Sequence, residues 1–217
     1  LIRSIDVDAS NVEISDGIVY ASVGSSIQSF ELLTGDPIRR LSLSGGSDIT
    51  GIVREGSFLY TMDANRNLGV VDISGFGLVE RASLVLPHGA GKISVTNGIV
   101  YAAAINSFNR GGFATVDVSN PDNPVLLSGS DVVSPFVGPG TSVAANGSGI
   151  GLVVGSNGAN VVDIVDLSDP EETNELVTRF TLPAAPQDVT IASGLAFVAG
   201  GSAGLHVVNY LPFDNQG

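Results

Sequence analysis

The pentapeptide "GIVYA" occupies residues 17–21 and returns letter for letter at residues 98–102. Each copy stands between short runs in which apolar and polar residues alternate, which is typical of two strands joined by a tight turn. Glycine adopts a positive φ angle at little steric cost, so Gly17 and Gly98 predict β-hairpins. The copied unit is therefore a hairpin.

The hairpin recurs five times along the chain. The copies read "VEISDGIVYASV", "ITGIVREGSFLYTM", "ISVTNGIVYAAAI", "SVAANGSGIGLVVG" and "VTIASGLAFVAG", and their turn glycines lie 39 to 49 residues apart. A period of this length is typical of propellers and other repeat arrays. The expected turns are Asp16-Gly17, Glu55-Gly56, Asn97-Gly98, Asn146-Gly147 and Ser193-Gly194.

Further β-rich runs follow each hairpin. Third runs occupy residues 26–32, 68–74, 113–119, 160–168 and 204–210, and fourth runs occupy 38–44, 79–86, 124–130 and 177–183. Four antiparallel strands per repeat are the blade of a β-propeller. Since no stretch of helical periodicity is long enough to bury a face, the sequence predicts an all-β, five-bladed β-propeller of four-stranded antiparallel blades in a single domain, residues 1–217.

The expected blades span about residues 8–46, 47–87, 88–135, 136–183 and 184–212. The fifth lacks a fourth strand, whereas residues 1–7 have the pattern of one. Arg3 precedes Val12 by nine residues, as Arg40 precedes Ile49. We therefore expect residues 1–7 to pair with the third strand of the last blade and close the ring, which would remove an exposed edge. An incomplete piece of a larger propeller is the alternative.

The third strands and the turns after them carry a family resemblance. "FATVDVSNPDNPVLLSGS" (113–130), "NVVDIVDLSDPEE" (160–172) and "LGVVDIS" (68–74) resemble the LVIVD-type repeat, in which a strand ending in Val-Val-Asp or Ile-Val-Asp precedes Ser, an Asn or Asp, and Pro. The third and fourth blades match well, the second lacks the proline turn, the fifth has Asn209 in place of Asp, and the first reads "SFELLTGDP" (29–37). The resemblance implies a propeller segment of a large, multidomain secreted or cell-surface protein of bacteria or archaea.

The residues of this signature have a structural role that follows from their chemistry. A short side-chain acceptor at the end of a strand captures backbone N–H groups of the turn that follows, and proline presets that turn. We assign this role to Asp72, Asp117, Asp166, Ser74, Ser119, Ser168, Pro121 and Pro170. The resemblance brings no catalytic residues.

The composition excludes several functions. There are 22 carboxylates against nine Lys and Arg, and Lys92 is the only lysine, so the chain cannot easily build the basic patch that nucleic acid requires. Residues 132–162 carry no charge, but prolines, asparagines and glycines interrupt them, so no membrane insertion is expected. Without cysteine, neither disulfides nor thiolate metal sites are possible.

Candidate binding residues lie in the loops expected at the mouth of the central channel. A rigid scaffold holds such loops while their sequence is free to vary, so they are where binding residues accumulate. The longest of the connections between second and third strands is "INSFNRGG" (105–112). The candidates are Asp48, Asp63, Asn65, Arg66, His88, Lys92, Asn109, Arg110 and Asp188.

Motifs that would bring a metal or a cofactor fail on inspection. "DANRN" (63–67) resembles the start of a calcium loop, but Leu68 replaces the required Gly and Ser74 the closing Glu. "HGAGK" (88–92) lacks the spacing of a phosphate-binding loop and no helix follows it. Two histidines cannot supply a three-histidine zinc site. The sequence therefore predicts no cofactor, no metal and no catalytic residue.

We expect a non-enzymatic propeller module that binds a protein or a glycan or acts as a rigid scaffold. The alternative is a glycoside hydrolase-like enzyme with carboxylates at the channel mouth, because Glu13, Asp48 and Asp188 lie at or just before first strands and such enzymes use two carboxylates about 5 to 9.5 Å apart. The chain has no Trp and only 6% aromatic residues, which leaves little surface to stack a sugar ring.

Overall fold

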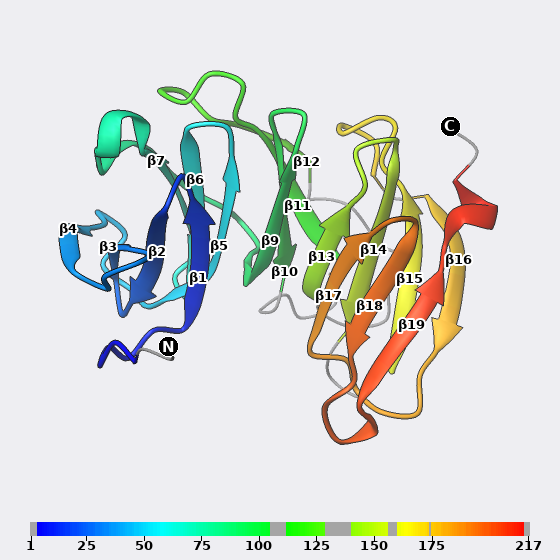
Figure 1. Ribbon diagram of the computed structural model, residues 1–217. Coiled ribbons are helices and arrows are strands. Elements are labelled where there is room, and N and C mark those ends of the chain that lie inside the picture. Colours follow the sequence, from blue (N-terminus) through cyan, green and yellow to red (C-terminus); the bar gives the residue numbers. More distant parts are fainter. Residues whose placement is uncertain (1–3, 105–111, 129–139, 156–159, 174, 215–217) are drawn as a thin grey trace.

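The computed structural model describes residues 4–104, 112–128, 140–155, 160–173 and 175–214. They form five antiparallel sheets (Figure 1), and within each sheet consecutive strands pair with each other. The first four sheets have four strands and the fifth has three. The predicted all-β architecture of four-stranded antiparallel blades is confirmed for these four sheets.

The elements follow in chain order. The first sheet contains β1 (Asn11–Ser15), β2 (Ile18–Val23), β3 (Ser26–Glu31) and β4 (Pro37–Ser42). The second contains β5 (Ile49–Glu55), β6 (Phe58–Asp63), β7 (Asn67–Asp72) and β8 (Val79–Val85), with η1 (Ser74–Phe76) between the last two. The third contains β9 (Ala90–Thr96), β10 (Ile99–Ala104), β11 (Phe113–Asp117) and β12 (Val125–Ser128). The fourth contains β13 (Gly140–Ala145), β14 (Ile150–Gly155), β15 (Val161–Asp166) and β16 (Leu176–Thr181). The fifth contains β17 (Asp188–Ala192), β18 (Leu195–Ala199) and β19 (Leu205–Asn209), with η2 (Gly201–Ala203) before β19 and η3 (Leu211–Phe213) after it.

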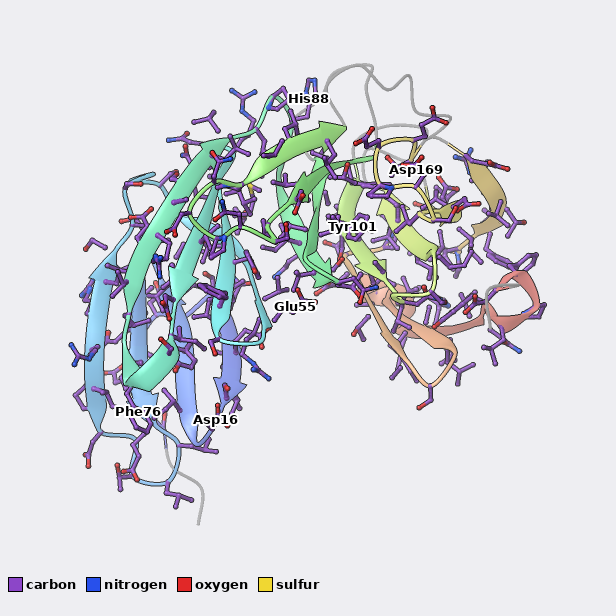
Figure 2. The ribbon with its side chains drawn as sticks, turned by 90° about the horizontal axis from the view of Figure 1, so that it is seen from above. Asp16, Glu55, Phe76, His88, Tyr101 and Asp169 are labelled. Atoms are coloured by element: carbon purple, nitrogen blue, oxygen red, sulfur yellow. The ribbon has the colours of Figure 1, made fainter. Side chains whose placement is uncertain are left out.

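The first strands of the sheets lie on the inside of the array. β1 contacts β5, β5 contacts β9, β9 contacts β13 and β13 contacts β17. Seen from above (Figure 2), the sheets follow one another in an arc from the first, in blue, to the fifth, in orange and red. This is the arrangement of propeller blades around an axis.

Three of the five predicted hairpin turns are confirmed. Asp16-Gly17, Asn97-Gly98 and Ser193-Gly194 each place two successive residues at positive φ, between 50° and 78°. These angles belong to the two-residue turn that matches the twist of paired strands, and glycine takes the second position at least cost.

The other two turns differ from the prediction. Glu55 pairs with Phe58, so the second hairpin turns at Gly56-Ser57 and not at Glu55-Gly56. In the fourth hairpin Ala145 pairs with Gly151, which leaves a longer loop between them. There the side chain of Asn146 accepts hydrogen bonds from the backbone N–H groups of Ser148 and Ile150, at 2.9 and 3.0 Å.

The hydrophobic core is divided among four layers, one between each pair of neighbouring sheets. In each layer an apolar residue of a first strand packs against the sheet before it; these residues are Ile52, Ile93, Val143 and Val189. A tyrosine of the second strand packs against the sheet after it in the first three layers. Burial, and then the Glu55 carboxylate, raise the pKa of Tyr60 to about 12.

The turns after the third strands have the structure that their sequence predicts. Asp72, Asp117 and Asp166 each accept a hydrogen bond of 2.8 Å from the backbone N–H of the serine two residues later. Hydrogen bonds from the hydroxyl group and then from the backbone N–H of Ser74 and Ser119 lower the pKa of Asp72 and of Asp117, respectively. Asn209 accepts the equivalent bond from Leu211 at 3.1 Å, so the fifth sheet forms the same turn with an amide.

The predicted closure of the ring by residues 1–7 is not observed. Residues 4–7 form no strand, and residues 1–3 lie outside the described part of the chain. Within the described ranges β19 pairs with β18 alone. Ile5 lies instead beside Gly35 of the first sheet, and in Figure 1 the N-terminal segment is below β1 while β19 belongs to the far end of the array. Among the described residues, no strand therefore joins the first sheet to the fifth.

The hairpin turns give a test of the fold. Gly98 has a φ of 73°, and a Cβ atom there would meet only ordinary contacts, 3.6 Å or more from Ser119. We expect Gly98→Ala to lower the free energy of unfolding by about 1 to 2 kcal/mol, the cost of a left-handed conformation for a residue with a side chain. Urea denaturation measures this change. Gly89→Ala, at a glycine without positive φ and 3.4 Å or more from its neighbours, should change it by less than about 0.5 kcal/mol. Equal effects of the two substitutions would contradict the turn assignment.

Candidate binding site at the centre of the five sheets

The first strands of all five sheets line one cavity of about 450 Å³. Each strand contributes three consecutive residues, and Ser10 completes the wall. The triplets are Asn11-Val12-Glu13, Gly51-Ile52-Val53, Lys92-Ile93-Ser94, Ser142-Val143-Ala144 and Asp188-Val189-Thr190. We call this space the central cavity.

Successive side chains of a strand point to opposite faces, so the middle residue of each triplet faces away from its two neighbours. The middle residue is Val or Ile in all five, and in the second to fifth sheets it belongs to the core layer against the preceding sheet. Its two neighbours point to the opposite face of the strand. The residue before the middle one, which we call the leading position, is Asn11, Gly51, Lys92, Ser142 or Asp188.

Leading residues of different sheets hydrogen-bond to each other. The Lys92 Nζ atom of the third sheet donates to Asn11 Oδ1 of the first sheet at 2.6 Å. Ser142 Oγ of the fourth sheet donates to Asp188 Oδ1 of the fifth at 2.6 Å, and the same oxygen accepts the Val189 N–H at 2.9 Å. The leading residue of the second sheet, Gly51, has no side chain. These bonds therefore connect the neighbouring fourth and fifth sheets, and also the third and first sheets, which are not neighbours.

The cavity also carries a perturbed carboxyl group. Burial raises the pKa of Glu13, and the Arg54 cation opposes that change in part. Ser94 Oγ is buried and finds no hydrogen-bond partner among the described residues. The site thus combines a lysine that is already engaged, the Asp188 carboxylate, and a carboxyl group that gives up its proton less readily than usual.

Two residues of the predicted binding set, Lys92 and Asp188, lie in the central cavity. Asp48 and His88 do not line it, and His88 is in the β8–β9 loop (Figure 2). Asn109 and Arg110 lie outside the described residues. The predicted set is therefore not one cluster.

The remaining three, Asp63, Asn65 and Arg66, form the turn between β6 and β7. Asp63 is buried, and one of its oxygens accepts the backbone N–H groups of Asn65 and Asn67 at 2.8 Å each, while the other accepts the Asn67 amide at 2.8 Å. Arg66 donates from Nη1 to the Pro87 carbonyl at 2.5 Å. The "DANRN" segment is thus held by its own hydrogen bonds, and the described ranges contain no group of three metal-ligating side chains.

Sequence reasoning missed the polar partners in the cavity, Asn11 and Ser142. The signal was available: once the repeats are aligned on Val12, Ile52, Ile93, Val143 and Val189, both residues fall at the same position as Lys92 and Asp188. Candidate residues were sought in loops, whereas these side chains project from strands.

The repeated pentapeptide builds a second feature. Cavities of about 400 and 330 Å³ lie at the hairpin ends of the sheets, between the third and fourth sheets and between the first and second. Tyr101 lines the first of these and Tyr20 the second, and each is the tyrosine of a "GIVYA" copy. Figure 2 shows Tyr101 on the third sheet where the fourth approaches. Equivalent sequence has produced equivalent pockets.

Comparison with known proteins agrees with the resemblance seen in the sequence. The LVIVD repeat family matches residues 48–76 and 89–131, so the chain contains LVIVD repeats. These ranges cover β5 to β7 with η1, and the whole third sheet. The family model therefore matches the second repeat, which lacks the proline. It does not match the fourth repeat, although "NVVDIVDLSDPEE" (160–172) resembles the signature. No curated protein sequence matches the chain.

Solved structures with a similar fold include β-propellers. The Cps50 (Swd1) β-propeller domain of Myceliophteria thermophila has a TM-score of 0.69 at 14% identity, with 94% of this chain and 70% of that chain covered. A protein in the crystal structure of a nidogen/laminin complex has a TM-score of 0.64 at 16% identity, with 95% and 74% covered. The computationally designed Ika8 protein has a TM-score of 0.64 at 14% identity, with 91% and 57% covered. This chain thus spans little more than half of the Ika8 chain.

The fold and the repeats define the class of this chain as a propeller-like repeat protein. Its second and third sheets contain LVIVD repeats, within residues 48–76 and 89–131. In the described ranges, no helix has the length and apolar character needed to cross a bilayer.

The bond between Lys92 and Asn11 gives a test of the cavity. Lys92→Met removes a charged hydrogen bond that connects the third and first sheets, so we expect the free energy of unfolding to fall by about 1 to 3 kcal/mol. The control is Arg54→Met, because Arg54 donates to the Gly56 carbonyl of its own hairpin at an exposed site; it should change stability by less than about 0.5 kcal/mol. Urea denaturation measures the free energy of unfolding of both variants. An unchanged value for Lys92→Met would contradict the role assigned to Lys92.

The raised pKa of Glu13 predicts a pH dependence. In the unfolded chain this carboxyl group has its lower, ordinary pKa, so the unfolded state loses the proton first and stability falls as the pH rises through the interval between the two pKa values. Glu13→Gln should therefore be more stable than the native protein at pH 7, with the difference vanishing near about pH 3.

Asp117 has a lowered pKa, so its effect on the pH dependence of stability should be opposite to that of Glu13. Hydrogen bonds from Ser119 lower the pKa of Asp117, so its contribution is present above its ordinary pKa and is lost as the pH falls through the lowered one. Asp117→Asn should thus lower stability at pH 7 and leave it unchanged at strongly acid pH. Denaturation curves across pH test both variants, and the same sign for both would contradict the pKa directions.

Proposed function

We propose that this chain is a non-enzymatic propeller module of a secreted or cell-surface protein, and that it works as a rigid scaffold whose loops dock a protein partner. The observation that carries the proposal is the hydrogen bonding of the central cavity. Its lysine and its Asp188 carboxylate are committed to Asn11 and Ser142 of other sheets, so these groups hold the sheets in place. A scaffold requires such a fixed frame, and binding residues can then vary in the loops.

Further hydrogen bonds between neighbouring sheets support the scaffold role. The Glu55 carboxylate accepts the Gly98 N–H at 2.9 Å, joining the second hairpin to the third. The Arg81 guanidinium binds Asp122 of the next sheet through two bonds of 2.9 and 2.8 Å, and Asp72 of its own sheet at 3.1 Å. Arg81 is partly exposed, so we treat these as bonds that orient the sheets and not as large contributions to stability.

The charge of the chain indicates the kind of partner. The formal net charge of −13 favours a protein with a basic surface, which it would attract over long range at low ionic strength. The structural similarity to a protein in the nidogen/laminin complex is consistent with a role in protein assembly. The setting outside the cell follows from the LVIVD resemblance and is part of the proposal. Neutral glycans are the other class of ligand to test.

A second function has one specific observation in its favour. Glu13 and Asp188 line the same cavity, and the raised pKa of Glu13 is what a general acid needs. Glycoside hydrolases use two carboxyl groups in one cavity, one of them as a general acid. Asp48, the third carboxylate considered, does not line this cavity. The hydrogen bond from Ser142 already occupies one Asp188 oxygen, which favours the scaffold.

The experiment immobilises the chain and measures binding of purified cell-surface and extracellular-matrix proteins and of neutral glycans, at low and high salt. We expect binding of a basic protein that weakens as salt is added. Asp48→Asn, in a loop at one end of the sheets, should weaken it, whereas Asp16→Asn, equally a surface carboxylate but in a hairpin turn at the other end, should not. Loss of binding in both variants, or in neither, would contradict the assignment of the docking face.

A parallel assay with aryl glycosides separates the second function. The scaffold proposal expects no turnover by the native protein. If the native protein hydrolyses aryl glycosides, and Glu13→Gln loses this activity but still unfolds cooperatively, the hydrolase function would replace the scaffold proposal.

A further inference from the structure

The outward face of the first sheet exposes a residue that every other sheet buries. Val12 occupies the middle of its triplet, as Ile52, Ile93, Val143 and Val189 do in theirs. Those four are buried against the preceding sheet, whereas Val12 is 53% exposed. Ile14, on the same face two residues later, is also exposed. The first sheet therefore has the apolar surface that other sheets use to contact the preceding sheet, but no described sheet covers this surface.

The fifth sheet shows the same feature on its opposite face. Val207 of β19 lies in register with Phe197 of β18 and Thr190 of β17. In the other four sheets the third-strand residue in this row is buried; these residues are Ser29, Val70, Thr115 and Ile164. Val70 and Ile164 belong to the core layer shared with the next sheet, and Thr115 Oγ1 donates a hydrogen bond to the Pro170 carbonyl of the next sheet. Val207 is 54% exposed, and Leu205 on the same face is exposed as well.

The edge of the fifth sheet is also prepared for a further strand. Asn209 has formed the turn that in the second, third and fourth sheets precedes a fourth strand. That turn is fastened to the fourth sheet, because Asn146 Nδ2 and Ser148 Oγ both donate to Asp214, at 2.9 and 3.0 Å. Within the described ranges β19 pairs with β18 only, so its other edge offers backbone groups for pairing.

We propose that these two faces are the halves of further sheet-to-sheet contacts, completed by additional blades of the same repeat in the same polypeptide, outside residues 1–217. A strand of that polypeptide pairs with the free edge of β19, and the next blade covers Val207 and Leu205. Another blade covers Val12. The ring then closes through these blades.

The existing contacts argue for this occupant. The interface between neighbouring sheets occurs four times in the described chain and uses the same positions each time. Each open face carries one half of it, so a blade of the same repeat is complementary without any new chemistry. Contiguous exposed apolar surface is uncommon on a complete domain and marks an interaction site.

The number of sheets argues for the source. The similar propeller chains are longer than this one, which covers 57% to 74% of the Ika8, Cps50 and nidogen/laminin chains. Adding about two or three blades keeps the total within the four to eight that propellers use, whereas a second copy of this chain would double the five sheets and exceed that range.

Cysteine labelling tests the proposal, because the chain contains no cysteine of its own. Val207→Cys is placed on the open face and Val79→Cys on β8 is the control, since both valines are 54% exposed. Each variant is made in the complete polypeptide encoded by the gene and, for comparison, in residues 1–217. The readout is the rate of reaction with a maleimide under native conditions.

In the complete polypeptide we expect Val207→Cys to react about ten-fold more slowly than Val79→Cys, because burial requires local opening before reaction. In residues 1–217 the two should react at similar rates. Equal rates in the complete polypeptide would overturn the proposal. Protection of Val207→Cys in residues 1–217 that increases with protein concentration would also overturn it, and would assign the face to a second copy.

Discussion

The packing of one sheet against the next is the interaction on which this structure depends. Each sheet has apolar residues on both faces, so it cannot bury them by itself and needs a neighbour on each side. In the second to fifth sheets, the Val or Ile in the middle of the first strand is buried against the preceding sheet. Burial of one such side chain contributes about 1.5 to 3 kcal/mol. The stability of the array is therefore shared among its interfaces, with the middle sheets held on two sides.

Sequence patterns were sufficient for the features that depend on near neighbours. Alternating apolar residues and the Asp-Gly and Asn-Gly turns predicted the strands, because period and turn chemistry act over a few residues. The turn at Gly56-Ser57 escaped this reasoning, since Glu55-Gly56 and Gly56-Ser57 are both acceptable turn sequences and pairing of Glu55 with Phe58 decides between them. Closure of the ring by residues 1–7 is not found among the described residues, and it depends on the summed curvature of five sheets, which no local pattern reports.

The central cavity was predicted only in part, and for a related reason. Lys92 and Asp188 stood out as charged residues near strand starts, but their partners Asn11 and Ser142 are distant along the chain. Only the superposition of repeats brings these four residues to one level. Polar residues at that level do two things at once: they satisfy each other in a partly buried space, and they link sheets across the axis. Because Lys92 and Asp188 are engaged in this way, they support the proposal of a rigid frame.

The leading positions have a consequence for how such a protein can change. Their five occupants are one cation (Lys92), one carboxylate (Asp188) and three uncharged residues (Asn11, Gly51 and Ser142), whereas the next residue is Val or Ile in every sheet. The residue that sets the polarity of the cavity wall and the residue that packs between two sheets are thus neighbours on one strand. A substitution at a leading position therefore changes the polar lining of the cavity at one sheet and leaves the buried Val or Ile beside it in place, although Lys92 and Asn11, or Ser142 and Asp188, must change together to keep their hydrogen bonds.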